Sequence, residues 1–304
     1  MKLSLLILYS CFFLQVAAND SFLDTITHQG SEIDQFHFLH QKKIKTLLIS
    51  EASAYAISLI ALNQLWYADY PRSRFHFIND NREWLQMDKM GHLSASYYTG
   101  VVGIKAYEWA GFSRKKAIWY GGMTGSIFLT IIEVLDGTSK QWGASSGDLI
   151  ANTTGSLLAI GQALRWNTQK IQLKYSYHPT NWAKINPGQL GGNHLERALK
   201  DYNGQTYWMT FNIKSLLNIE SNIFPNWLGF SLGYSGDAMT QPFPEEDKGK
   251  RYRQYYVSFD VDLNKIKTKS KIVNSVLYTF GFLKFPMPTL ELSNRNISFH
   301  PIYH

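Results

Sequence analysis

The stretch at residues 85–100, "LQMDKMGHLSASYYTG", places two ionisable side chains where a long run of small and apolar residues begins. A helix turns by about 100° per residue, so Asp88 and His92, four residues apart, share one face. The stretch therefore predicts the start of a buried helix that carries a polar pair.

Further segments around this stretch have the length and composition of helices. We expect helices at 46–66, 88–111, 114–137 and 145–166, which together form a helical domain over residues 46–166. Gly111 and Gly137 stand where glycine commonly ends a helix. Glycine, serine and alanine recur along the inner segments, and such small residues let helix backbones approach closely.

The sequence leaves open whether these helices cross a membrane. Each segment has roughly the ~20 residues that a span needs, but Glu51, Lys105 and Glu108 interrupt the apolar runs. Basic residues are spread over all the connecting loops, without the excess on one side that orients spanning helices. A membrane-embedded bundle and a compact bundle packed on itself, or lying on a membrane surface, both fit this pattern.

The chain changes character after residue 170. Apolar and polar residues alternate in "VSFDVDL", 257–263, which predicts a strand with Val257, Phe259 and Val261 on a buried apolar face. On this interpretation, substituting Val261 by Asp buries a charge. Other strand-like runs lie at 205–213, 227–234, 289–293 and 296–303. The predicted class is α+β: an N-terminal bundle of about four helices, followed by a small antiparallel β-rich region at 170–304.

The N-terminal residues 1–18 have the pattern of a secretory signal peptide. Lys2 precedes an apolar run, and small residues end at Ala18, where we expect cleavage. Residues 19–45 would then lead into the helices. An uncleaved membrane anchor is the alternative. A lipoprotein site at Cys11, the one cysteine of the chain, is disfavoured because the residues after it stay apolar.

The composition points to the cell envelope. The formal net charge of +7 is scattered along the chain, which favours anionic lipids or glycans as partners over nucleic acid. Aromatic residues make up 15% of the chain, and Trp and Tyr settle at water–lipid boundaries. We expect an exported, membrane-associated protein on the periplasmic side or in the outer membrane, with a lipid or another envelope component as partner.

Polar residues inside the helical domain are the candidates for a site. Glu133 follows the apolar run "SIFLTII" near the end of a helix, where the helix dipole disfavours an acid. Each candidate also has a plain structural explanation: Asp88 as a helix cap, Ser145 and Asp148 as a capping box, and His92 as a buried, hydrogen-bonded histidine. The candidate cluster consists of Asp88, His92, Glu133 and Asp148, with Lys89, Asp136, Asn152 and Gly155 as supporting residues. The sequence identifies neither a cofactor nor a particular metal.

The segments "DKMGHLSASYY" and "IIEVLDGTSKQWGASSGDLIANTTGSLLA" resemble the YfiM-like envelope family of unknown function. The order of these motifs is also similar to that of VanZ-like membrane proteins. The resemblance covers about residues 88–162 and links the same positions, from Asp88 to Gly155. It implies an envelope protein but no established reaction. The lipid anchor of the short family members does not carry over to this longer chain.

Two classes of function follow. The first is a non-enzymatic envelope protein whose polar cluster fixes helix packing and whose sheet binds lipid, glycan or protein. The second is a hydrolase or transferase for a lipid or cell-wall precursor, with a metal at the cluster or with His92 as general base oriented by Asp88. The VanZ-like pattern alone adds transport or antibiotic-resistance accessory roles. Residues that converge on an open pocket would favour the enzyme, and residues paired off in the interior would favour the structural role.

Overall fold

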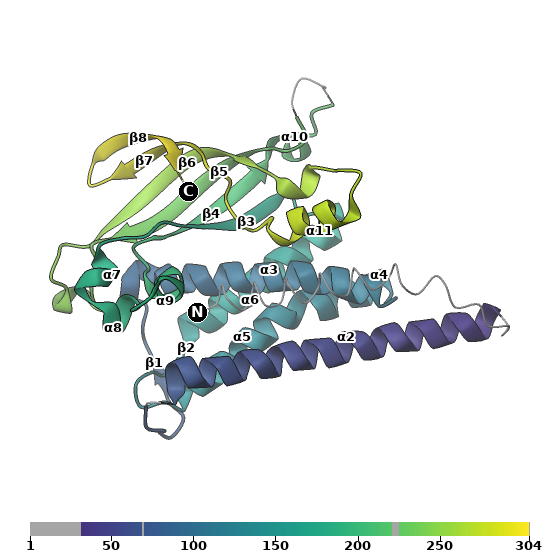
Figure 1. Cartoon of the computed structure of the whole chain (residues 1–304), viewed down its shortest axis with the longest axis horizontal. Helices are drawn as coiled ribbons and strands as arrows, with labels where there is room; N and C mark the ends of the chain where they lie inside the picture. The colour runs from purple at the N-terminus through teal and green to yellow at the C-terminus, as the bar shows by residue number, and fades with distance from the viewer. Residues whose placement is uncertain (1–31, 69, 221–224, 304) are drawn as a thin grey trace. The chain divides into compact units, whose positions relative to one another are not determined.

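The computed structural model describes residues 32–68, 70–220 and 225–303. The expected signal peptide at 1–18, the lipoprotein alternative at Cys11 and much of the 19–45 segment lie outside these residues. The chain forms two compact units (Figure 1). The described part of the first unit comprises 32–78 and 95–164, and that of the second comprises 79–94 and 165–303.

The first unit is helical, as the sequence predicted. Its elements are α2 (Glu32–Leu62), a π-helical turn (Asn63–Tyr67), most of α3 (Met87–Trp109), α4 (Arg114–Lys116), a second π-helical turn (Ala117–Gly121), α5 (Gly122–Gly137), nearly all of α6 (Ser146–Trp166) and the short parallel pair of β1 (Phe77–Ile78) and β2 (Ala144–Ser145). Helices α4 and α5, joined by their π-helical turn, reproduce the expected helix at 114–137. The expected first helix begins earlier, at Glu32.

Small residues allow the helices of this unit to pack closely. A Cβ atom added to Gly103 of α3 would lie 2.2 Å from the carbonyl oxygen of Gly121, and one on Gly125 would lie 2.3 Å from that of Ser96. Ser96 Oγ also lies 3.0 Å from Ser156 Oγ of α6. The interior of this unit is therefore lined by glycine and hydroxyl groups at its closest contacts, as in helix pairs that pack in membranes.

Large aliphatic side chains lie on the outside of the same helices, and each is at least half exposed: Ile49, Ile57 and Ile60 on α2, Ile127 and Val134 on α5, and Ile150 and Leu164 on α6. Two helical segments are long and apolar enough to cross a membrane, His40–Leu62 and Arg114–Gly137. Soluble core helices can pass the same length test, but the first segment is only 17% buried.

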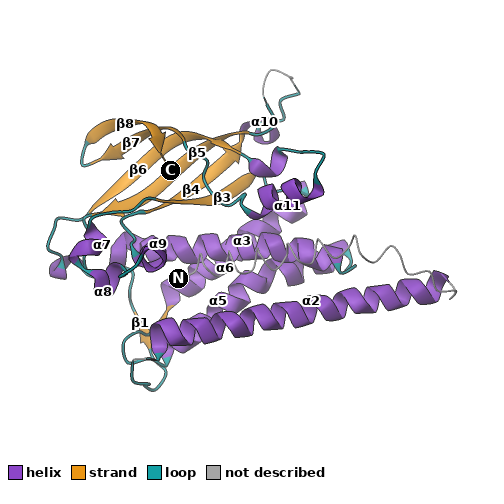
Figure 2. Ribbon diagram, viewed as in Figure 1, coloured by secondary structure: helices purple, strands orange, loops and turns teal. Residues whose placement is uncertain are grey.

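The second unit is built on an antiparallel sheet of six consecutive strands (Figure 2). The strands are β3 (Ile171–Tyr177), β4 (Gln205–Asn212), β5 (Leu228–Asp237), β6 (Tyr252–Val261), β7 (Met287–Ser293) and β8 (Asn296–Tyr303). The helices of this unit are α7 (Trp182–Ile185), α8 (Pro187–Leu190), α9 (His194–Lys200), α10 (Ile213–Leu216) and α11 (Lys271–Thr279). Together with the helical first unit, this sheet confirms the α+β class.

The sheet curls until its two ends approach each other. Tyr303 at the end of β8 lies with its hydroxyl 3.0 Å from Thr206 Oγ1 of β4. The Tyr175 N–H of β3 donates to the Phe282 carbonyl at 2.8 Å, and the Lys284 N–H donates to the Tyr175 carbonyl at 2.9 Å. The segment before β7 therefore pairs with β3, and one face of the sheet becomes an interior.

Along residues 257–263 the interior of this curled sheet is polar, opposite to the expectation, whereas Trp208, Tyr256 and Tyr303 form an aromatic cluster elsewhere in it. Ser258 and Asp260 are 4% and 0% exposed, whereas Val257 and Phe259 on the other face are 42% and 50% exposed. The predicted strand is correct, but its predicted buried face is wrong. Period-two alternation separates two faces without stating which of them is covered. The expectation that Val261→Asp would bury a charge depended on that face and is therefore wrong as well.

Candidate functional site

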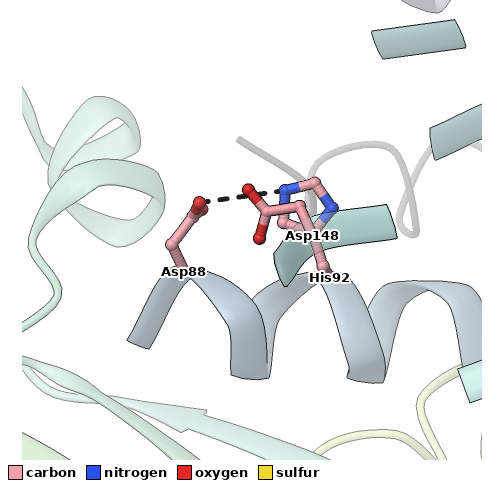
Figure 3. A group of neighbouring side chains, drawn as sticks. All are labelled: Asp88, His92 and Asp148. Carbon is pink, nitrogen blue, oxygen red and sulfur yellow. Dashed lines mark ion pairs between the residues drawn. The ribbon is translucent and has the colours of Figure 1, made fainter. Parts of the chain in front are cut away.

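Asp88 and His92 lie on adjacent turns at the start of α3, on one face as their spacing predicted. His92 Nε2 is 3.8 Å from Asp88 Oδ2, and the histidine side chain is 1% exposed (Figure 3). The Tyr202 hydroxyl donates to Asp88 Oδ1 at 2.9 Å. The tyrosine thus holds one carboxylate oxygen while the other faces the imidazole. Asp88 lies inside the first turn, because α3 begins at Met87, so it is not the N-cap residue.

Asp148 of α6 belongs to the first unit, where it is 3% exposed. Asp88 and His92 belong to the second unit, and their carboxylate and imidazole are donor types that suit several divalent cations.

In the helical unit, Glu133 and Ser145 are joined by a hydrogen bond. Ser145 caps α6, since its Oγ accepts from the Asp148 N–H at 3.1 Å. In a complete capping box the Ser145 N–H would be bound by the side chain three residues on. Here that N–H donates instead to Glu133 Oε2 at 3.0 Å. Glu133, 2% exposed, thus ties the end of α5 to the start of α6.

Two of the supporting residues, Lys89 and Asp136, each bind a different partner. Lys89 forms an ion pair with the buried Asp80 just before α3. Asp136 accepts a 2.5 Å hydrogen bond from the Tyr67 hydroxyl. Burial, and then the charge of Asp136, raises the pKa of Tyr67, so this hydroxyl stays protonated as the donor.

Asn152 joins a buried row of hydroxyl groups that links three helices. Its backbone carbonyl accepts from Ser96 Oγ at 2.5 Å, and Ser156 Oγ accepts from the Ser126 N–H at 3.1 Å. Gly155, next to Ser156, is buried on the same helix. These residues lock helix packing through short polar contacts, which is the structural role that the sequence left open for them.

The turn that leads into the site was missed by sequence reasoning. Trp84, Leu85 and Gln86 all have left-handed backbone angles, with φ of 45°, 52° and 64°. Non-glycine residues adopt this region at a cost, so the surrounding structure has to impose it. The Trp84 N–H donates to the Pro242 carbonyl at 3.0 Å, and the Tyr234 hydroxyl donates to the Leu85 carbonyl at 2.5 Å. Pro242 and Tyr234 are both far from this turn in the sequence, so no local sequence pattern predicts it.

Acidic groups gather beside this turn. Burial, followed by the charges of Asp80 and Asp88, raises the pKa of Glu83 to about 7. A carboxyl group is shifted this way when the ionised form is desolvated and faces like charges. Lys89 offsets part of this charge through Asp80. The local potential therefore favours a positively charged group close to Asp88.

Comparison with known proteins matches the region that holds this site. Residues 76–163 match the family model described as "Predicted periplasmic lipoprotein (DUF2279)". The match covers less than a third of the 304 residues and supports an exported protein associated with the cell envelope. It does not name the YfiM-like or VanZ-like groups, which stay a resemblance of motifs. No curated protein and no solved structure matches the chain.

Proposed function

We propose that the chain has a non-enzymatic, structural role at a membrane of the cell envelope. The burial of the histidine carries the non-enzymatic part. A general base has to reach the proton that it removes, directly or through one water. His92 at 1% and Asp148 at 3% exposure offer a substrate almost no surface.

The alternative is a metal- or histidine-dependent hydrolase or transferase for a lipid or cell-wall precursor. In this alternative Asp88 and His92 take part in the reaction, so His92 has to be open to the substrate. Histidine footprinting separates the two: diethyl pyrocarbonate should modify the exposed His194 rapidly and His92 slowly in the folded chain. Modification of both at similar rates would favour the enzyme.

A further inference from the structure

The outer face of the six-stranded sheet is apolar and uncovered over four strands. The register places Leu232 of β5, Val257 of β6, Leu290 of β7 and Phe299 of β8 in one row across this face. Their exposed fractions are 45%, 42%, 48% and 62%. Neighbouring rows add exposed apolar side chains of the same strands: Tyr255, Phe259, Leu292 and Ile297.

Within its own unit, this face is covered over β3 and β4 and at the Asp237 end of β5. A Cβ atom on Gly91 would lie 3.0 Å from the Tyr207 hydroxyl, so the start of α3 lies against β4. The Tyr175 hydroxyl donates to the Ala198 carbonyl of α9 at 2.8 Å, and the Tyr234 hydroxyl of β5 donates to the Leu85 carbonyl. The row from Leu232 to Phe299 stays exposed, and contiguous apolar patches on a folded unit mark an interaction site.

The opposite face of the sheet is buried, and its charged groups are paired. Asp260 pairs there with Lys174 and accepts a hydrogen bond from Thr210 Oγ1. A sheet with a satisfied polar interior and an aliphatic and aromatic exterior has the burial pattern of strands that meet lipid. Strands that meet water on one side place their polar residues there instead.

Basic residues lie at one end of the strands. Residues 263–273, which follow β6, hold four lysines and no acid: Lys265, Lys267, Lys269 and Lys271. Lys170 before β3 and Lys214 after β4 lie at the same strand ends. Exposed Ile272 and Trp227 accompany them. Lysines next to exposed apolar side chains suit a membrane surface with anionic headgroups.

The dimensions decide how such a face meets a bilayer. The apolar side chains on β6 run from Tyr255 to Phe259, which is about 14 Å at 3.4 Å per residue. A hydrocarbon core is about 30 Å thick. Charged residues stand beyond both strand ends, with Asp237 and Glu245 opposite the lysines. The strands are therefore too short to cross and fit an orientation along the surface.

We propose that this outer face of β5–β8 is a lipid-contacting surface, which lies flat on an anionic leaflet with its aliphatic side chains among the acyl chains. The proposal is independent of the burial of His92. It identifies the occupant as lipid because the apolar rows and the lysine end complement the two layers of a leaflet, acyl chains and headgroups.

A site-specific probe tests this contact in the full chain. Leu290→Cys in a Cys11→Ser background carries an environment-sensitive fluorophore on the face, and Leu195→Cys on α9 is the control. Leu195 is 69% exposed in the same unit but lies off the face. With phosphatidylglycerol–phosphatidylcholine vesicles we expect a blue shift for the Leu290 probe, with quenching by spin labels on the acyl chains, and no change for the Leu195 probe.

Charge variants test the lysine end with the same readout. Lys267→Gln with Lys269→Gln should weaken the vesicle-dependent shift, so that roughly thirty-fold more lipid is needed for the same shift. Lys248→Gln with Lys250→Gln, exposed beyond the opposite strand ends, should leave it unchanged. A Leu290 probe that stays in water with vesicles present would overturn the proposal. So would a concentration-dependent shift without vesicles, which would assign the face to a second copy of the chain.

Discussion

Lys174 and Asp260 form an ion pair of 2.8 Å in which neither side chain has exposed surface. The other carboxylate oxygen, Asp260 Oδ1, accepts from the N–H groups of Val261 and Phe285 at 2.8 and 3.1 Å. This aspartate therefore connects β3, β6 and the segment before β7. It is the centre of the polar part of this interior, which lies beside the aromatic cluster of Trp208, Tyr256 and Tyr303.

Removing the carboxylate should destabilise the sheet unit strongly. Asp260→Ala leaves Lys174 charged and buried without its partner, a change that costs about 3–5 kcal/mol in buried pairs. Chemical denaturation followed by far-UV circular dichroism measures this loss. Val257→Ala on the outer face is the control, because its side chain is 42% exposed, and it should cost well under half as much. Equal costs for the two variants would contradict a polar interior.

Lys284 gives the same interior a pH dependence. Burial lowers the pKa of Lys284 to about 8, and the attraction of Asp260 only partly opposes this shift. In the unfolded chain a lysine titrates near 10.4. Between pH 8 and about 10 the unfolded state binds more protons, so the free energy of unfolding should rise with pH across this window.

Lys284→Met isolates the contribution of this lysine. The free energy of unfolding of the wild type and of the variant is measured at pH 7.5 and at pH 9.5. Its increase between the two pH values should be larger in the wild type. Other titrating groups act on both proteins alike. A variant with the same increase as the wild type would show that Lys284 keeps its proton throughout the window.

The sequence predicted the elements of the sheet better than its orientation. The runs at 205–213, 227–234 and 296–303 lie on β4, β5 and β8, because alternation and turn residues are local signals. The inversion of β6 is not local. It depends on Lys174 and Lys284, distant in sequence, which supply the charges that make Asp260 an interior residue. β3 was not named as a strand in advance, although apolar and polar residues alternate along its sequence "IQLKYSY".

In the candidate site too, some features follow from the local sequence and others depend on distant segments. The shared face of Asp88 and His92 follows from helix geometry alone, and the Ser145 cap follows from its spacing to Asp148. Tyr202 and the left-handed turn before α3 depend on a fold that brings distant segments together. The coupling of Glu133 to the N–H of Ser145 was equally out of reach, although the position of Glu133 against its own helix dipole signalled that it needs a partner.

Substitutions at Glu133 should separate its hydrogen bond from its charge. Glu133→Ala leaves the buried Ser145 N–H without this acceptor, at a cost of about 1–3 kcal/mol in the free energy of unfolding. Glu133→Gln keeps an acceptor oxygen of the same reach and should retain part of that stability. Thermal unfolding of both variants measures the difference. A glutamine variant as unstable as the alanine variant would assign the effect to the charge.

Close helix packing gives the last prediction, which compares two glycines of the helical unit. A methyl group at Gly103 would meet the carbonyl oxygen of Gly121 at 2.2 Å and Thr124 Oγ1 at 2.6 Å, whereas one at Gly161 of α6 would meet nothing within 4 Å. Gly103→Ala should therefore push α3 away from the start of α5 and cost about 1–3 kcal/mol, the range for overpacked interiors. Gly161→Ala should instead stabilise its helix by about 0.5–1 kcal/mol, because alanine loses less backbone entropy than glycine. Unfolding temperatures measured in the same detergent or lipid should move in opposite directions. Two shifts of the same sign and size would show that α3 and α5 do not meet at Gly103.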